Sequence, residues 1–231
     1  MMPPVTVTEH VVPIRILSPK APPTVLSPLP SRDCSLLEGV SAVAVWDFGQ
    51  NIAGFVKVQV LDNPALPFQS GDTLILQHSE ILNATTNTIV RMNLGLAKAE
   101  DRYTFASAHA SSPSYRPTFT YHGFRYCQVC YLPAEQGVAR GAPPFSSSSS
   151  EFASVVGHAN PLPASLNVTA LWVHTAAETT GLMGLSSDAL TRVVAAVVAS
   201  QRSNLMSIPT DCPNRDERLG WLGDAAVGSC C

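Results

Sequence analysis

The sequence predicts a mainly β protein, an antiparallel β-sandwich followed by one helix and a charged loop. Short runs of β-branched and aromatic residues, separated by turn formers, fill residues 42–132, which is typical of a sandwich. A helical pattern of apolar residues begins only near Ser186. Two stretches rich in proline or serine, residues 1–37 and 134–164, are too poor in apolar side chains to form a core. We therefore expect an N-terminal Pro-rich segment at 1–37, a sandwich at 38–133, and a linker or insert at 134–164.

The strands of the sandwich follow a period of two. Residues 55–60 alternate polar and apolar side chains, and residues 73–78 follow the turn at Gly71. Residues 166–175 alternate in the same way and predict a return strand, within a segment 165–180, at the edge of the sandwich. Further strands are expected at 11–17, 101–105 and 123–132.

A glycine-flanked loop is expected within the sandwich at residues 47–54. Gly49 and Gly54 suit positions that need a positive φ angle or a close approach of two backbones. Trp46 and Phe48 beside this loop are expected to anchor the core.

The last region, residues 181–231, begins with the predicted helix. Ser186, Ser187 and Asp188 are good N-cap residues. One face then carries apolar residues at helical spacing, namely Leu190, Val193, Val194, Val197 and Val198. If it is unburied, this face is a surface for association with a partner. Pro209 biases Ile208 towards an extended conformation, so the acidic residues that follow lie on a loop.

Composition excludes several classes of function. Charged residues make up 13% of the chain and the net charge is −3, with no basic run, so nucleic acid is not an expected partner. We find no signal peptide and no segment long enough to span a bilayer, so no membrane association is expected and the compartment stays open.

The six cysteines are not spaced like the disulfide framework of a small secreted domain. Cys127 and Cys130 form a C-x-x-C pair, but residues three apart on a strand point to opposite faces. The pair is therefore expected to be structural, not a redox or metal site, and no cofactor is expected.

The segment 211–224, with the sequence DCPNRDERLGWLGD, concentrates carboxylates, arginines and a tryptophan. Glycoside hydrolysis needs a protonated acid, a second carboxylate, and polar and aromatic groups that hold a sugar. If residues 216–224 are helical, Glu217, Trp221 and Asp224 share one face. Residue types alone favour another interpretation, a set of surface ion pairs. A metal site is disfavoured because Arg215 and Arg218 already supply the countercharge.

The order of the residues in segment 211–224 is more informative than the types of residue it contains. It closely resembles the motif of bacterial-type α-L-rhamnosidases of glycoside hydrolase family 78. Four upstream strings extend the resemblance, residues 200–210 before the motif, and residues 46–54, 78–82 and 119–126 in the sandwich. The resemblance implies a concanavalin-like β-sandwich followed by the first helix and active-site loop of an (α/α)6 barrel.

The resemblance also implies removal of terminal α-L-rhamnose from rhamnosides with inversion of configuration. Glu217 would be the catalytic general acid. Asp211, Arg215 and Asp224 would bind rhamnose hydroxyls, and Trp221 would line the substrate pocket, with no metal ion. Because the acid must stay protonated, we expect the arginines to contact sugar hydroxyls or aspartates instead of Glu217.

One part of the family pattern has no counterpart in the sequence. The general base of the family is a glutamate far downstream, and no residue here matches it. We therefore expect a truncated fragment that binds a rhamnose-containing glycoside and is inactive by itself. The alternative is a non-catalytic carbohydrate-binding or structural β-sandwich module.

Overall fold

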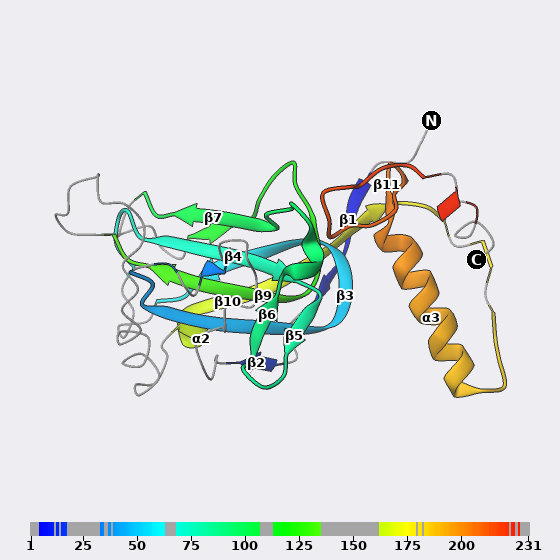
Figure 1. Cartoon of the computed structure of the whole chain (residues 1–231), viewed down its shortest axis with the longest axis horizontal. Helices are drawn as coiled ribbons and strands as arrows, with labels where there is room; N and C mark the ends of the chain where they lie inside the picture. Colours follow the sequence, from blue (N-terminus) through cyan, green and yellow to red (C-terminus); the bar gives the residue numbers. More distant parts are fainter. Residues whose placement is uncertain are drawn as a thin grey trace.

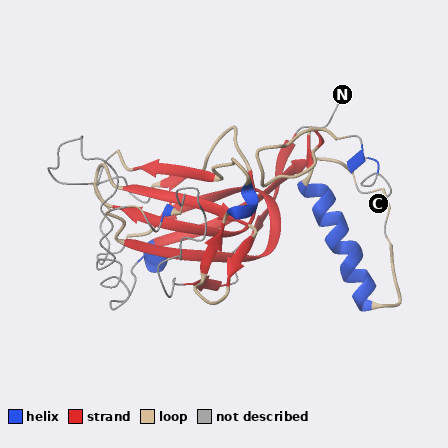
Figure 2. Cartoon of the chain, in the orientation of Figure 1, coloured by secondary structure: helices blue, strands red, loops and turns tan. Residues whose placement is uncertain are grey.

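We describe the fold from a computed structural model of the 231-residue chain. The structure describes residues 5–11, 13, 15–17, 33–34, 37, 39–62, 68–106, 113–134, 162–178, 180–181, 183–221, 223–224 and 226. A large antiparallel sheet forms one part of the molecule, and a single long helix lies beyond one end of it (Figures 1 and 2).

The main sheet has eight strands, and six of them run in the order β1-β10-β3-β9-β4-β7. The other two, β2 and β8, pair with β3, while β5 and β6 form a separate hairpin. The strands are β1 (Val5–Val11), β2 (Arg15–Leu17), β3 (Ala42–Val60), β4 (Thr73–Ser79), β5 (Ile81–Asn83), β6 (Thr88–Val90), β7 (Glu100–Thr104), β8 (Ser114–Tyr115), β9 (His122–Leu132) and β10 (Leu166–Thr175). Short helices are η2 (Met92–Leu94) and α2 (Leu162–Ser165).

The predicted loop at residues 47–54 is wrong, because β3 runs through it. The pairing of β3 with β9 shifts register between Asp47 and Ile52, so the extra residues form a bulge and the strand continues. Gly49 has a φ of 77°. At Gly54 a Cβ atom would lie 1.9 Å from the carbonyl oxygen of Leu171 on β10, which confirms the expected close approach of two backbones.

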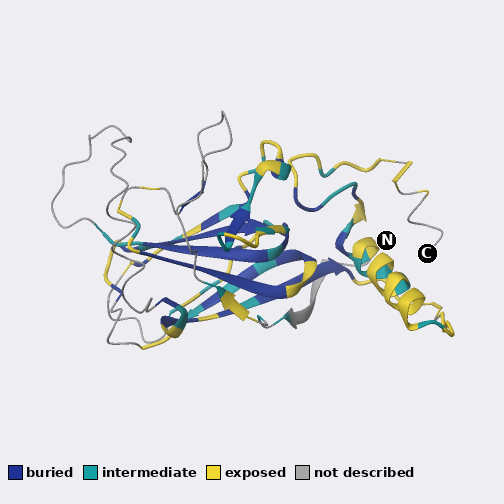
Figure 3. Ribbon diagram, turned by 60° about the horizontal axis from the view of Figure 1, so that its bottom comes forward, coloured by how far each residue is buried: buried dark blue, intermediate teal, exposed yellow. Residues whose placement is uncertain are grey.

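The main core lies against one face of the curled sheet. Its side chains come from β3, β4, β9 and β10, and they include the expected anchors Trp46 and Phe48, both almost fully buried. Two smaller clusters cover the other face, one around Cys34 and one between Tyr126 and the β5–β6 hairpin. The strands β3, β4, β9 and β10 are therefore buried over most of their length (Figure 3).

Two strand predictions need correction. Residues 166–175 do form β10, but this strand lies between β1 and β3 and not at the sheet edge, because the N-terminal β1 pairs with it. The expected first strand at 11–17 is divided between β1, which ends at Val11, and β2, which pairs with β3. Most of the stretches at 1–37 and 134–164 lies outside the described residues.

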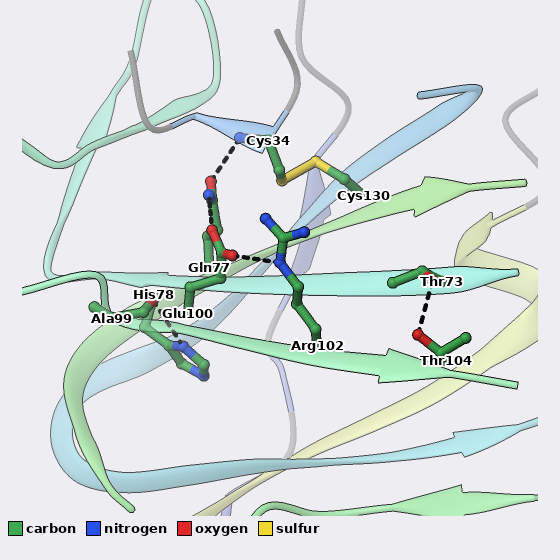
Figure 4. A network of polar contacts seen from close by, with 9 residues as sticks. All are labelled: Cys34, Thr73, Gln77, His78, Ala99, Glu100, Arg102, Thr104 and Cys130. Carbon is green, nitrogen blue, oxygen red and sulfur yellow. Dashed lines mark hydrogen bonds and ion pairs between the residues drawn. A yellow bond between two sulfur atoms is a disulfide. The ribbon is translucent and has the colours of Figure 1, made fainter. Parts of the chain in front are cut away.

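Cys127 and Cys130 lie on opposite faces of β9, as expected. Cys127 is a buried free thiol in the main core, and burial raises its pKa well above the ordinary value. Cys130 forms a disulfide with Cys34, 96 residues away in the sequence (Figure 4). This bond was not predicted from the spacing of the cysteines.

The predicted helix is α3 (Asp188–Ser203), preceded by Ser187 as N-cap. Its apolar face is largely open, since Leu190 is 55%, Val193 58% and Val197 41% exposed. Near its C-terminal end, Ala199 packs against the main core. None of the described helices is long and apolar enough to cross a membrane.

Candidate active site at the acidic segment

The acidic segment returns to the sheet after α3. Two short strands, β11 (Leu205–Met206) and β12 (Ile208–Pro209), form a small hairpin. The backbone amide of Ser207 donates to the hydroxyl of Thr175 at 2.8 Å, and Thr210 donates from its amide to the carbonyl of Asn204 at 2.7 Å. The loop that carries the candidate acid thus starts where β10 ends.

The segment is not helical over residues 216–224, so the expected shared face of Glu217, Trp221 and Asp224 is wrong. The chain is bent at 213–216 and irregular to residue 221, and a helical turn begins only at Gly223. The irregular chain at 217–221 agrees with the low helix propensity of Gly220.

Asp211 closes the loop upon itself. Its Oδ1 accepts the backbone amide of Leu219 at 2.7 Å, and its own amide donates to the Leu219 carbonyl at 3.1 Å. The thiol of Cys212 donates to Oδ2 at 2.8 Å. Partial burial favours the neutral acid, but these hydrogen bonds outweigh it and lower the pKa of Asp211. The carboxylate is therefore held in a fixed place as an anion.

One side of the loop is buried against the sandwich. Pro213 and Asn214 are buried, and they lie directly over Gly123 of β9. A Cβ atom at Gly123 would come within 2.8 Å of both the Asn214 backbone nitrogen and Pro213 Cγ. Glycine is required at this contact for steric reasons.

The other side of the loop is open to solvent. Arg215 Nη2 lies 3.6 Å from Glu217 Oε2, and both side chains are well exposed. The expectation that the arginines avoid Glu217 is therefore wrong for Arg215, which forms the kind of surface ion pair that the residue types alone favoured. Trp221 is 49% exposed, and Asp224 is also exposed.

Arg218 lies against an aromatic ring, a contact that was not predicted from the sequence. Its guanidinium lies 4.3 Å from the ring centroid of Tyr121, directly before β9. Burial raises the pKa of Tyr121, so its hydroxyl stays neutral. This contact fixes the chain next to Glu217 without using the Glu217 carboxylate.

Among the described residues, two groups of side chains have the composition of metal ligands. Asp211, Cys212 and Glu217 each place one ligand atom within 4.8 Å of the others. In this group the Cys212 thiol keeps its proton for the bond to Asp211, and burial with that bond raises its pKa. A protonated thiol is a poor metal ligand.

The second group, His78, Asp101 and His122, lies inside the sandwich. His122 Nε2 contacts both oxygens of Asp101, at 3.0 and 3.1 Å. The rings of His78 and His122 are stacked at 4.2 Å with an interplanar angle of 21°. Stacked and nearly parallel rings place their nitrogen lone pairs in two separate, nearly parallel planes, which is unfavourable for binding one ion by both rings. We interpret the group as a hydrogen-bonded part of the core.

The residues that hold the loop were not predicted from the sequence. The amide of Asn214 donates to the carboxylate of Glu80, which follows β4. A signal was present, because Glu80 and Gly123 both lie in strings that carry the family resemblance, residues 78–82 and 119–126. The resemblance of these strings indicated that Glu80 and Gly123 matter, but it did not show that both residues contact the acidic segment.

Comparison with known proteins agrees with this arrangement. Residues 39–148 match the model of the bacterial α-L-rhamnosidase concanavalin-like domain, and residues 178–230 match that of the bacterial α-L-rhamnosidase six-hairpin glycosidase domain. An α-L-rhamnosidase of Streptomyces avermitilis is 32% identical over 206 residues, which are 89% of this chain and 16% of the relative. One from Formosa agariphila is 29% identical over 91% of this chain and 19% of the relative.

Solved structures give the same result. The α-L-rhamnosidase of Dictyoglumus thermophilum matches with a TM-score of 0.69 and 29% identity, over 99% of this chain and 20% of that one. The Streptomyces avermitilis enzyme, solved in complex with L-rhamnose, matches with a TM-score of 0.65 and 29% identity, over 98% of this chain and 16% of that one. The chain thus spans about a fifth or less of these relatives. Its concanavalin-like sandwich and the start of its six-hairpin glycosidase domain show that the chain belongs to the bacterial-type α-L-rhamnosidase family.

Proposed function

We propose that this chain supplies the acid side of an α-L-rhamnosidase active site, with Glu217 as the general acid. One observation carries the proposal. The match to the six-hairpin glycosidase domain includes the whole acidic segment, and the structure presents Glu217 on the open side of a loop whose other side is fixed. The substrate would be a glycoside with a terminal α-L-rhamnose, the sugar with which the Streptomyces avermitilis relative was solved.

In this proposal Glu217 protonates the glycosidic oxygen as the bond to the rhamnose carbon breaks. Before this step, when the substrate binds, Arg215 exchanges its exposed contact with Glu217 for a sugar hydroxyl, and Glu217 takes up from solvent the proton that it later gives to the glycosidic oxygen. Asp211 and Asp224 accept hydroxyl protons in hydrogen bonds, and Trp221 packs against the apolar face of the sugar.

Asp211 is not suited to be the general base. An inverting pair needs its carboxyl groups about 6.5 to 9.5 Å apart, so that a water molecule fits between them. One oxygen of Asp211 and one of Glu217 lie within 4.8 Å, and both Asp211 oxygens already accept hydrogen bonds from the loop. The proposal therefore takes the base from a part of the glycosidase domain that these residues do not include.

The proposal is tested with the chain joined to the rest of the six-hairpin glycosidase domain of the Streptomyces avermitilis relative, here called the completed enzyme. We expect it to hydrolyse phenyl α-L-rhamnoside, and Glu217→Gln to lower kcat by at least about a hundredfold, within the usual range for general acid catalysis. Glu178→Gln, also in the matched region and outside the acidic segment, is the control.

Full activity of the Glu217→Gln enzyme would contradict the proposal. Binding of L-rhamnose by a sandwich that ends at Thr175 would instead support the carbohydrate-binding alternative, and it is measured by the rise in melting temperature at millimolar sugar.

A further inference from the structure

We propose that Glu80 of the sandwich is a positioning residue for the candidate acid, because its carboxylate fixes the place of the acidic segment on the sheet. This inference rests on the proposed function for its catalytic part. The docking itself is a property of the chain and can be tested separately.

Glu80 joins three segments that are far apart in the sequence. Its Oε1 accepts the side-chain amide of Asn51, in the bulged part of β3, at 2.6 Å. Its Oε2 accepts the amide of Asn93 in η2 at 3.4 Å, and also the amide of Asn214 in the acidic segment. An ionised carboxylate only accepts hydrogen bonds, so it can satisfy three amide donors at once. Bonds to an ionised acceptor are about twice as strong as neutral ones.

The surface around Glu80 is shaped for this segment. Gly123 leaves room for the backbone of Asn214, as described above. At Gly95, which directly follows η2, a Cβ atom would lie 2.7 Å from Asp216 Oδ1. The two glycines thus leave room for Asn214 and Asp216, the residues before and after Arg215. Glu80 binds the first of these two residues, Asn214.

The contacts hold the candidate acid from both directions along the chain. Asn214 is bound to Glu80 three residues before Glu217, and Arg218 is stacked on Tyr121 one residue after it. The short span between these two points leaves the Glu217 backbone little freedom. An error of about 1 Å in the placement of a catalytic group can lower the rate by about a hundredfold. Loss of the Glu80 contact should therefore lower the rate of the catalysed reaction.

The first experiment measures hydrogen exchange in the 231-residue chain. Glu80→Gln keeps the shape of the side chain but replaces one acceptor oxygen by an amide donor, which opposes the amides of Asn51, Asn93 or Asn214. We expect backbone amides of residues 211–219 to exchange at least about tenfold faster, with β9 unchanged. The control is Glu100→Gln, because Glu100 also accepts a side-chain amide, from Gln77 at 2.7 Å, but within the sandwich. Equal exchange of 211–219 in both variants would overturn the docking role.

The second experiment measures kcat and KM of the completed enzyme for aryl α-L-rhamnosides with poor and good leaving groups. A displaced acid gives less help to a poor leaving group, so we expect Glu80→Gln to lower kcat by about tenfold or more for phenol and much less for 2,4-dinitrophenol. An equal loss for both substrates would overturn the positioning role.

The two failures are distinguishable. If Glu217→Gln also shows no dependence on the leaving group, the acid assignment itself is wrong. If Glu217→Gln shows the dependence and Glu80→Gln does not, only the inference about Glu80 is wrong.

Discussion

The sandwich and the acidic segment differ in the burial of their paired carboxylates. Asp47 in β3 is fully buried, and it is paired with Arg15 at 2.7 Å and with Arg125 at 2.8 Å. Arg215 and Glu217 in the segment are both well exposed and 3.6 Å apart. A buried carboxylate without partners is strongly destabilising, whereas an exposed ion pair contributes little. The arginines that pair with Asp47 therefore hold the fold, and charges on the open side of the segment remain available for a ligand.

The largest expected effect comes from breaking the sandwich at Gly54. Gly54→Ala would place Cβ 1.9 Å from the Leu171 carbonyl oxygen, so β3 and β10 would have to separate. We expect a loss of about 3 kcal/mol or more in the free energy of unfolding, measured by urea denaturation. Gly184→Ala is the control, since no atom lies within 4 Å of its Cβ position. Equal stability of the two variants would show that the paired backbones are not as close as described.

A smaller effect is expected from pH. Burial, with the nearby His122 and Arg91, lowers the pKa of His78 well below 6.5. In the unfolded chain the imidazole of His78 binds a proton near pH 6.5, whereas in the folded state it stays neutral at that pH. Stability should therefore fall as the pH decreases from about 7 to 5, with a slope of up to about 1.4 kcal/mol per pH unit from this residue.

His78→Asn tests the sign of this effect, because asparagine does not titrate and can still donate to the carbonyl of Ala99, which His78 Nδ1 contacts at 3.3 Å. We expect the variant to be less stable at pH 7 but to lose less stability between pH 7 and 5. An unchanged pH dependence would exclude His78 as its source.

The smallest effect is expected on the open side of the segment. Arg215→Ala removes an exposed pair and should change the free energy of unfolding by less than about 0.5 kcal/mol. In the completed enzyme the same substitution should raise KM for an aryl α-L-rhamnoside if Arg215 binds a hydroxyl. A large loss of stability would mean that the open side also holds the fold.

The same contrast explains what could be predicted from the sequence. Alternation identified the second half of β3, at residues 55–60, and β10, because a strand buried mainly on one face has a regular pattern. The strands β4 and β9 are buried along almost their whole length, and they were predicted from β-branched and aromatic runs between turn formers. It did not reveal that β3 continues through the bulge at residues 47–52, since that depends on pairing with β9. The Cys34–Cys130 disulfide also joins residues 96 apart, and no local pattern indicates such a partner.

For the site, the string at 211–224 was enough to select Glu217, Arg215 and Trp221 as candidates. The expected helix failed because the loop is shaped by tertiary contacts, the closure by Asp211 and the docking of Asn214 on Glu80 and Gly123. Glu80 and Gly123 lie about 90 to 135 residues upstream of Asn214, so they could not be found from local spacing.

The account depends most on Glu217 as the general acid, and the dependence of its loss on the leaving group tests this directly. The measurement is kcat/KM of the completed enzyme and its Glu217→Gln variant for aryl α-L-rhamnosides from phenol to 2,4-dinitrophenol. A general acid predicts a loss of at least about a hundredfold for phenol that shrinks to tenfold or less for 2,4-dinitrophenol, whose departure needs little protonation. An equal loss across the series, or none, would contradict the assignment.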